Sequence, residues 1–492
     1  MSREAPSTVF GTFSLAGPRF GDILHVGCRV RWGLGLGKSM KAKRPSATGR
    51  IDVDFIPSDT PIIGFTGALG SGCTFMAKAV ADAYTYGHYE LSAPIHEIAR
   101  EKRRKESAQE LQDIGNSLRK KYGADYLVRV AIEKASGDWK AGKTRPAIVF
   151  DSFRNTSEVD ALRQWPNFYL VSVQASTGER QKRLLKDKRV VQDQAAFEAA
   201  DRRDQQERLN YGQQVRLCND LADIIIVNNE YVASVDKSEF ARRKFARYVE
   251  LIMGISKGKR PAESLPKPEE RLMTMAYCAS KGSSCLKRQV GALIGRESGE
   301  VLSTGCNDVP EGADSCLRDP ELGSCAKDKI QEVIGAGFAH CPKCGRRISL
   351  KRLRCLECGK KIARFTKRCP ACGKDPGIDY RCKCSTRVFS QFLPGASSST
   401  GKLLDMCRAV HAEQNAILNL TKMGRPVPAD AVLYTTTYPC NLCASLIVNV
   451  GIRKLVYAEP YVTKEAEKIL DGKVETRPFE GVKSSAFFRL YR

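Results

Sequence analysis

The sequence has no apolar run long enough to cross a membrane, and its first thirty residues lack the apolar core of a secretion signal. Acidic residues are also scarce, because 55 Asp and Glu stand against 80 Lys and Arg and leave a net charge of +25. The first lack predicts a cytoplasmic protein with no membrane partner. The second predicts a polyanionic partner, either nucleotide phosphates or nucleic acid.

The length of 492 residues is too great for one hydrophobic core, so we expect two or three domains. Residues 254–270 are rich in Gly, Pro and charge and are interpreted as a linker that leaves the flanking domains separable. The predicted order is a disordered or misassigned extension (1–50), a doubly wound α/β domain (51–253), the linker (254–270) and a second α/β domain (271–492) with a cysteine-rich insertion at about 338–390.

Two short motifs in the second domain predict a catalytic zinc site. The sequence HAE at 411–413 is followed by PCNLC at 439–443. His411, Cys440 and Cys443 supply one imidazole and two thiolates, which leaves a fourth tetrahedral position open for water. Glu413 is then the proton shuttle of a zinc deaminase that attacks C4 of a cytosine ring. The alternatives are a structural zinc knuckle or three ligands that never meet, although no fourth protein ligand stands beside these three.

The insertion carries closely spaced cysteine pairs in a strongly basic segment. Residues 341–390 hold fifteen Lys and Arg but three acidic residues. Eight thiolates suit two structural zinc ions in zinc ribbons, and the spacing leaves open which pairs share an ion. Three further cysteines, Cys316, Cys325 and Cys407, are interpreted as unpaired thiols rather than a third structural site. The predicted structural ligands are Cys341, Cys344, Cys355, Cys358, Cys369, Cys372, Cys382 and Cys384.

A strand, a glycine loop and a helix near residue 61 predict a phosphate-binding loop. PIIGFTG leads into ALGSGCT and then into the amphipathic segment FMAKAVADAY. Asp151 ends a later apolar strand and is a candidate magnesium ligand. Cys73 stands where such loops carry lysine, which predicts nucleotide binding, sensing of an infection product or a role in assembly rather than phosphoryl transfer. The candidate nucleotide-binding residues are Gly67, Gly70, Gly72, Thr74 and Asp151.

The HAE and PCNLC motifs, together with SSCLKRQVGALIGRESGEVLSTGCNDVPEG upstream, resemble the CMP/dCMP branch of the cytidine deaminase superfamily. The resemblance covers about residue 271 to the end. It implies an α/β/α domain with a mixed five-stranded sheet, a homo-oligomer, and contact between Asn307 and the nucleotide sugar. Residues 61–254 are similar to P-loop nucleotide kinases of the nucleoside-monophosphate type.

The combination of both parts resembles the bacterial anti-phage dCTP/dCMP deaminases. It implies conversion of free dCTP and dCMP to dUTP and dUMP with release of ammonia, which depletes cytosine nucleotides during infection. An inhibitory RNA or protein at the basic insertion is a further hypothesis. One alternative is a cytosine deaminase acting on RNA or single-stranded DNA, although the insertion offers few aromatic residues for base stacking, namely Phe365, Tyr380 and Phe389. Another is a nucleotide sensor with an inactive deaminase.

Overall fold

The computed structural model describes the chain in several parts. These are residues 56–318 except 187–189, 206, 208, 231–235 and 257–264, then residue 325, and residues 407–491 except 461–462. Four short strands between residues 338 and 389 are described by their backbone. All of these residues belong to one contact unit, 51–492. Within them, no helix combines the length and the apolar character that crossing a membrane requires.

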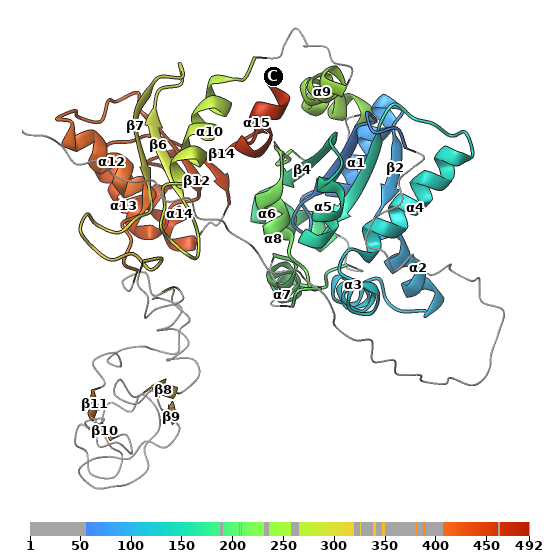
Figure 1. The fold of residues 1–492 in the computed structure, drawn as a ribbon, viewed down its shortest axis with the longest axis horizontal. Helices are drawn as coiled ribbons and strands as arrows, with labels where there is room; N and C mark the ends of the chain where they lie inside the picture. Colours follow the sequence, from blue (N-terminus) through green and yellow to red (C-terminus); the bar gives the residue numbers. More distant parts are fainter. Residues whose placement is uncertain are drawn as a thin grey trace, which may run out of the picture. The chain divides into compact units, whose positions relative to one another are not determined.

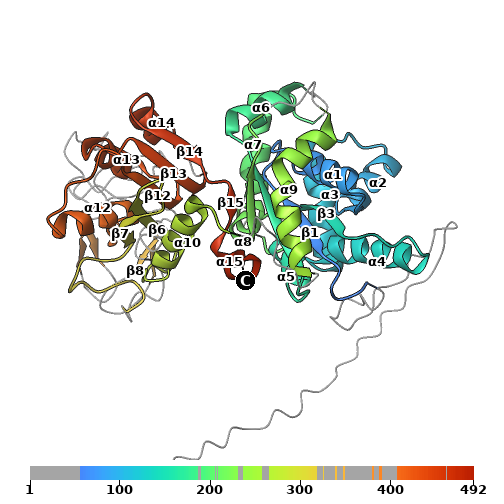
Figure 2. The same ribbon diagram turned by 90° about the horizontal axis from the view of Figure 1, so that it is seen from above.

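The first sheet has six strands in the order β15-β5-β4-β1-β3-β2, and all but β15 are parallel (Figures 1 and 2). The apolar runs that predict buried strands coincide with β1, β3, β4 and β5. The strands are β1 (Ile62–Thr66), β2 (Gly87–Glu90), β3 (Ile148–Phe153), β4 (Phe168–Gln174), β5 (Ile224–Val227) and β15 (Gly481–Val482).

Helices cover both faces of this sheet, because successive strand residues point to opposite sides and both sides are apolar. Ile63 and Phe65 pack against α1 and α9, whereas Ile62 and Leu170 belong to the core beneath α4, α5 and α8. The helices are α1 (Cys73–Tyr84), α2 (Ala93–Glu101), α3 (Ala108–Tyr122), α4 (Tyr126–Lys140), α5 (Thr156–Arg163), α6 (Thr177–Lys186), α7 (Gln194–Gln205), α8 (Val215–Leu221) and α9 (Lys237–Ser256).

The second sheet is the mixed five-stranded sheet that the resemblance implies, in the order β14-β13-β12-β6-β7. Strand β6 is antiparallel to β7 and β12, and β12, β13 and β14 are parallel. Helix α10 packs on one face, and α12, α13 and α14 pack on the other. The elements are α10 (Pro268–Ser280), β6 (Gly291–Gly295), β7 (Val301–Cys306), α12 (Ala412–Lys422), β12 (Val432–Thr437), α13 (Asn441–Asn449), β13 (Lys454–Glu459), α14 (Lys464–Leu470) and β14 (Glu475–Pro478).

Two antiparallel hairpins lie in the insertion between these elements. They are β8 (Phe338–His340) with β9 (Arg347–Ser349), and β10 (Asp379–Arg381) with β11 (Arg387–Phe389). The eight cysteines predicted to bind structural zinc lie outside the described residues. The zinc ribbons therefore stay a prediction.

The C-terminal segment joins the first sheet rather than the second. Strand β15 pairs with the edge strand β5, and α15 (Ser484–Leu490) places Ala486 and Leu490 in the core beside α1 and α9. The buried carboxylate of Glu270 accepts hydrogen bonds from the Arg247 guanidinium at 2.8 Å and from the Val482 N–H at 2.9 Å. The linker predicts separable domains, whereas these contacts join the C-terminal segment to the first sheet. Sequence reasoning missed the contacts because a two-residue strand leaves no pattern in the sequence.

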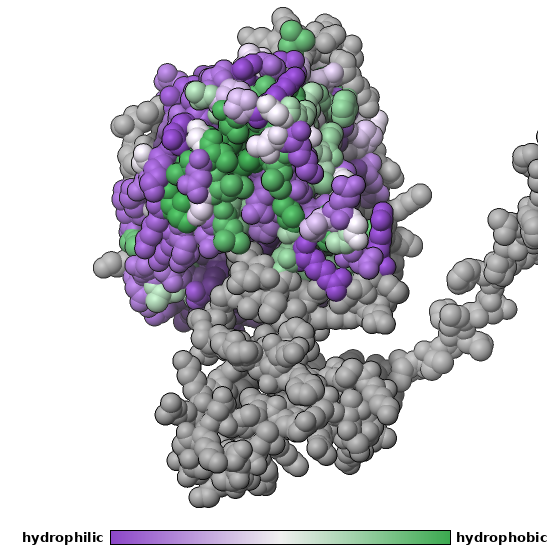
Figure 3. All heavy atoms as spheres, turned by 90° about the vertical axis from the view of Figure 1, so that its left-hand side faces the viewer, coloured by the Kyte–Doolittle hydropathy of each residue, from purple (hydrophilic) through white to green (hydrophobic). Residues whose placement is uncertain are grey.

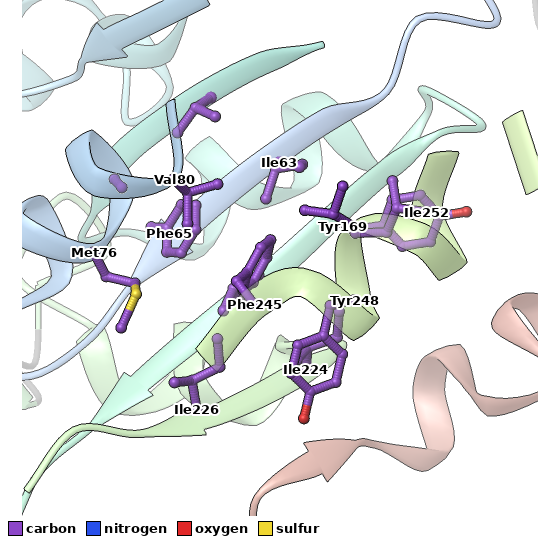
Figure 4. Close-up of a cluster of buried hydrophobic side chains, with 14 of the residues drawn as sticks. Ile63, Phe65, Met76, Val80, Tyr169, Ile224, Ile226, Phe245, Tyr248 and Ile252 are labelled. Atoms are coloured by element: carbon purple, nitrogen blue, oxygen red, sulfur yellow. The ribbon is translucent and has the colours of Figure 1, made fainter. Parts of the chain in front are cut away.

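The core beneath α9 is well packed (Figure 4). The Phe245 ring lies 5.7 Å from the Phe65 ring, measured between centroids, and both side chains are fully buried. The buried residues of α9 recur at helical spacing, which turns one face of the helix toward the sheet. They include Phe240, Ala241, Phe245, Tyr248, Val249 and Ile252.

We predict that Phe245→Ala lowers the free energy of unfolding by about 3–5 kcal/mol, because the lost ring leaves a cavity in a close-packed core. The matched control is Phe488→Ala, since Phe488 is 74% exposed and its removal opens no cavity. Urea unfolding followed by circular dichroism measures both. Equal midpoints for the two variants would contradict the packing described here.

Candidate active site

The starts of two helices carry the predicted zinc ligands. His411 is the N-cap of α12, and Cys440 is the N-cap of α13, with Cys443 in the first turn that follows. The His411 N–H donates to Gln414 Oε1 at 3.0 Å, which fixes the first turn of α12. Helix N-termini carry positive potential, so both helices favour thiolate and hydroxide at the point where they meet.

The three predicted ligand atoms lie within 4.8 Å of one another. His411 Nδ1 is 3.3 Å from Cys440 Sγ and 3.4 Å from Cys443 Sγ. A tetrahedral zinc ion with ordinary Zn–N and Zn–S bonds holds such donors ~3.5 Å apart. The donors therefore fit zinc in both chemistry and spacing, and they leave one coordination position without a protein ligand among the described residues.

Glu413 lies beside this group. Its carboxylate oxygen Oε2 is 3.5 Å from Cys443 Sγ, and the side chain is buried. Burial raises the pKa of Glu413, because a low dielectric disfavours the charged form. A raised pKa makes a carboxylate a stronger proton acceptor, as a general acid–base group requires.

The thiols around His411 are polarised by hydrogen bonds. A hydrogen bond with Cys443 and one with His411 lower the pKa of Cys440 to about 4, although burial acts against them. The thiols of Cys407 and Cys440 hydrogen-bond to His411 and raise its pKa to about 10. Sequence reasoning gave Cys407 no place at this site, although it stands four residues before His411.

Backbone contacts hold the ligand-bearing segment in place. Gly305 of β7 lies so close to α12 that a Cβ atom there would be 2.3 Å from the Ala416 nitrogen. Only glycine permits this approach. Asp308 and Val410 then form an isolated antiparallel bridge, with the Val410 N–H donating to the Asp308 carbonyl at 2.9 Å. The chain before His411 is thus fixed to the chain after β7.

Asn307 lies at the end of β7, next to this bridge. Its amide oxygen accepts from the Val290 N–H at 2.6 Å, and its amide nitrogen donates to the Arg288 carbonyl at 2.9 Å. In this structure the side chain therefore organises the turn before β6. The contact with a nucleotide sugar stays a prediction, since each end of the amide keeps one further hydrogen-bonding position.

The predicted phosphate-binding residues meet at the carboxyl end of β1 and β3. Gly70 and Gly72 adopt positive φ angles of 82° and 89°, and Gly72 is the N-cap of α1. A Cβ atom on Gly67 would lie 2.4 Å from the Val173 carbonyl oxygen. The Thr74 hydroxyl is 3.4 Å from the Ser152 hydroxyl, next to Asp151.

Two buried polar groups beside this loop, the Asp151 carboxylate and the Cys73 thiol, have unusual surroundings. Asp151 is fully buried, and its carboxylate has no hydrogen-bond partner among the described residues, although His88 Nε2 lies 3.5 Å away. Burial raises the pKa of the Cys73 thiol to about 12, so it stays neutral and cannot replace a lysine charge. His88, the second residue of β2, was missed from the sequence, because it reaches Asp151 only through the pairing of β2 with β3.

Comparison with known proteins finds a family match for the second part of the chain. Residues 266–459 match a family described as the cytidine and deoxycytidylate deaminase zinc-binding region. After this match, we call residues 266–459 the deaminase domain. The deaminase domain contains the three donors, Glu413 and Asn307, so its motif residues and its geometry agree.

Two relatives carry the name deoxycytidylate deaminase. The protein of Schizosaccharomyces pombe is 27% identical over 202 residues, which are 41% of this chain and 40% of that protein. The protein of Enterobacteria phage T4 is 27% identical over 190 residues, which are 39% of this chain and 77% of that protein. The chain thus spans two fifths of the S. pombe relative's length.

A solved structure, shikimate kinase from Acinetobacter baumannii in complex with shikimate, aligns over 40% of this chain and 98% of its own. Its sequence identity is 15% and its TM-score is 0.26. A similarity at this level supports no conclusion about the first sheet, whose topology is described from its own strands.

We predict that Cys443→Ser removes one zinc ion per chain, because it takes away one of three donors at an open site. Glu413→Gln is the matched control: it changes a side chain in the same cluster but keeps all three donors, so its zinc content should equal that of the unaltered protein. Elemental analysis of the purified proteins measures both. Unchanged zinc in Cys443→Ser would show that the trio holds no metal.

Proposed function

We propose that this chain is a zinc-dependent hydrolase that deaminates free deoxycytidine nucleotides, converting dCMP or dCTP to dUMP or dUTP and ammonia. The observation that carries the proposal is the juxtaposition of a buried Glu413 with three donors spaced for zinc. The match of residues 266–459 to the deaminase family supports it. The names of the S. pombe and phage T4 relatives support dCMP as a substrate.

The chain's own residues divide the work in this reaction. When bound, zinc supplies a Lewis acid that lowers the pKa of a water molecule toward neutrality. Glu413 takes a proton from the attacking water, delivers it to N3 of the cytosine ring and then assists departure of the amine. His411, Cys440 and Cys443 would hold the metal in a fixed position, because all three stand at the starts of helices. The raised pKa of Glu413 suits a group that must change protonation state twice.

The finer parts of the proposal rest on the resemblance to anti-phage dCTP/dCMP deaminases. They are the use of dCTP, the depletion of nucleotides during infection and an inhibitory RNA or protein at the basic insertion. A cytoplasmic location is likewise a prediction from the sequence. The alternative, a deaminase of cytosine in RNA or single-stranded DNA, depends on an insertion whose cysteine pairs lie outside the described residues.

A homo-oligomer is also part of the proposal. Exposed apolar side chains of the deaminase domain include Val301, Leu418, Met423 and Leu442. Figure 3 shows apolar residues gathered on the side where α12, α13 and β7 lie in Figure 1. An apolar surface of this kind is commonly covered by another chain, and a second copy is the occupant that the resemblance implies.

The purified chain should form uracil product from dCMP or dCTP in a parallel assay that also contains CMP, CTP and a cytosine-containing single strand. Glu413→Gln should lower the rate by about 100- to 10,000-fold, the usual contribution of one general acid–base group, at unchanged zinc content. Product from the single strand alone would support the alternative. A rate that Glu413→Gln leaves unchanged would overturn the mechanism.

We also infer that the first sheet binds a nucleotide phosphate together with magnesium but transfers no phosphoryl group. A buried carboxylate without hydrogen-bond partners is costly, and a cation beside Asp151 would remove that cost. The Thr74 hydroxyl and the Asp151 carboxylate are oxygen ligands of the type that magnesium prefers. The neutral Cys73 thiol supplies no charge for the outer phosphates.

A thermal-shift titration with ATP, GTP and dCTP, with and without magnesium, tests this inference. Ligand at about 100 times its Kd should stabilise the chain by about 2.7 kcal/mol. Asp151→Asn should remove the magnesium-dependent part, whereas Asp160→Asn, an exposed acid on α5, should leave it unchanged. Equal magnesium-dependent shifts in both variants would place the cation elsewhere. In a separate variant, Cys73→Lys, no gain in nucleotide affinity would show that the loop no longer holds phosphate.

A further inference from the structure

The glycine loop of the first sheet, residues 67–74, is bound to an acidic residue of helix α7. The N–H of Leu69, inside this loop, donates to Asp204 Oδ2 at 2.9 Å, and the Asp204 side chain is buried. Backbone N–H groups of a glycine loop are the groups that bind phosphate oxygens. A carboxylate oxygen is an acceptor of the same kind, so Asp204 occupies part of the place that a phosphate would take.

A second group that could bind an anion at this place is also occupied. The guanidinium of Arg154, which follows β3, donates to Asp204 Oδ1 at 2.5 Å. A guanidinium pairs with phosphate as readily as with carboxylate, because both present oxygens that match its planar donors. In this structure the Leu69 N–H and Arg154 therefore both bind a carboxylate of the same chain.

The charges beside the loop disfavour a further anion while Asp204 stays there. Burial raises the pKa of the Cys73 thiol, and the negative charges of Asp151 and Asp204 raise it further. The positive charge of Arg154 acts in the opposite direction. Two carboxylates and one guanidinium leave an excess of negative charge, which repels a phosphate. Magnesium beside Asp151 would compensate one of the two carboxylates, so the other must leave.

Polar contacts and a small apolar cluster hold α7 beside the loop. Arg180 of α6 donates to the Leu69 carbonyl at 3.1 Å and also to the Asp201 carboxylate. Arg203 pairs with Asp113 of α3 at 2.7 Å. Polar contacts of this kind can be exchanged for water, so α7 can leave the loop while the cores on the two faces of the sheet stay packed. The apolar cluster is separate from those cores and consists of Ala108, Val191, Phe197 and Ala200.

We propose that α7 is an autoinhibitory element, in which the Asp204 carboxylate closes the glycine loop and a nucleoside triphosphate binds only by displacing it. The inference rests on the nucleotide site proposed above and adds how that site is controlled. Displacement exchanges a carboxylate for a phosphate at the same two partners, the Leu69 N–H and the Arg154 guanidinium. Arg154 then supplies the positive charge that the neutral Cys73 thiol does not.

Calorimetric titration of the full chain with ATP, GTP and dCTP, each with excess magnesium, tests the proposal. Asp204→Asn keeps the shape of the side chain but removes its charge. It should raise the nucleotide affinity by about 10- to 100-fold, the range that one charged hydrogen bond accounts for. Glu198→Gln is the matched control, because it removes one negative charge from the exposed face of the same helix and should leave the affinity unchanged.

An affinity of Asp204→Asn that is equal to or below that of Glu198→Gln would overturn the autoinhibition and leave the nucleotide site standing. No binding by any of the three chains would instead overturn the nucleotide site on which the inference rests.

Because Asp204→Asn could fail to fold, amide hydrogen exchange in the unaltered chain provides a second measurement. Saturating nucleotide with magnesium should slow exchange in residues 67–74 and speed exchange in α7, because the helix leaves the loop as the phosphate enters. Exchange in α7 that slows or stays unchanged while the loop becomes protected would also overturn the proposal, since the helix would then stay in place when nucleotide binds.

Discussion

A tetrahedral zinc ion needs donor atoms ~3.5 Å apart, and here three donors come from the starts of two different helices. The second sheet meets this requirement. The pairing of β12 with β13 fixes the end of β12, after which α13 begins. Gly305 lets α12 pack directly against β7. The bridge between Asp308 and Val410 then sets the approach to His411. Together these features position the side chains of His411, Cys440 and Cys443.

The two sheets are joined by the end of the chain. Strand β15 covers the edge of β5, which would otherwise expose unpaired backbone groups. Glu270 of α10 receives hydrogen bonds from Arg247 of α9 and from Val482 and Tyr491 of the C-terminal segment, so groups that pack on the first sheet compensate a buried charge beside the second. Removing one partner of such a buried group is strongly destabilising. The stability of the deaminase domain is therefore tied to the sheet that carries Asp151 and the glycine loop.

Much of this arrangement could be predicted from local patterns. HAE and PCNLC lie at helix starts, and apolar runs ending in glycine or aspartate predict β1 and β3, because local spacing determines both. The rest depends on contacts distant in sequence. Cys285 and Cys316 line one cavity although they are far apart in the sequence. Asp151 meets His88 through the pairing of β2 with β3. The two residues of β15 are too few for any periodicity, so their place in the first sheet was not predictable.

The central claim is that water replaces the amino group of cytosine, and the origin of the product oxygen tests it most directly. The reaction would be run on dCMP in water enriched in ¹⁸O, and the product would be analysed by mass spectrometry. Product left in the same water without the protein would correct for exchange. Hydrolysis predicts one ¹⁸O atom at C4 of each uracil that forms. Product without the label would contradict the account, because the oxygen would then have come from a source other than water.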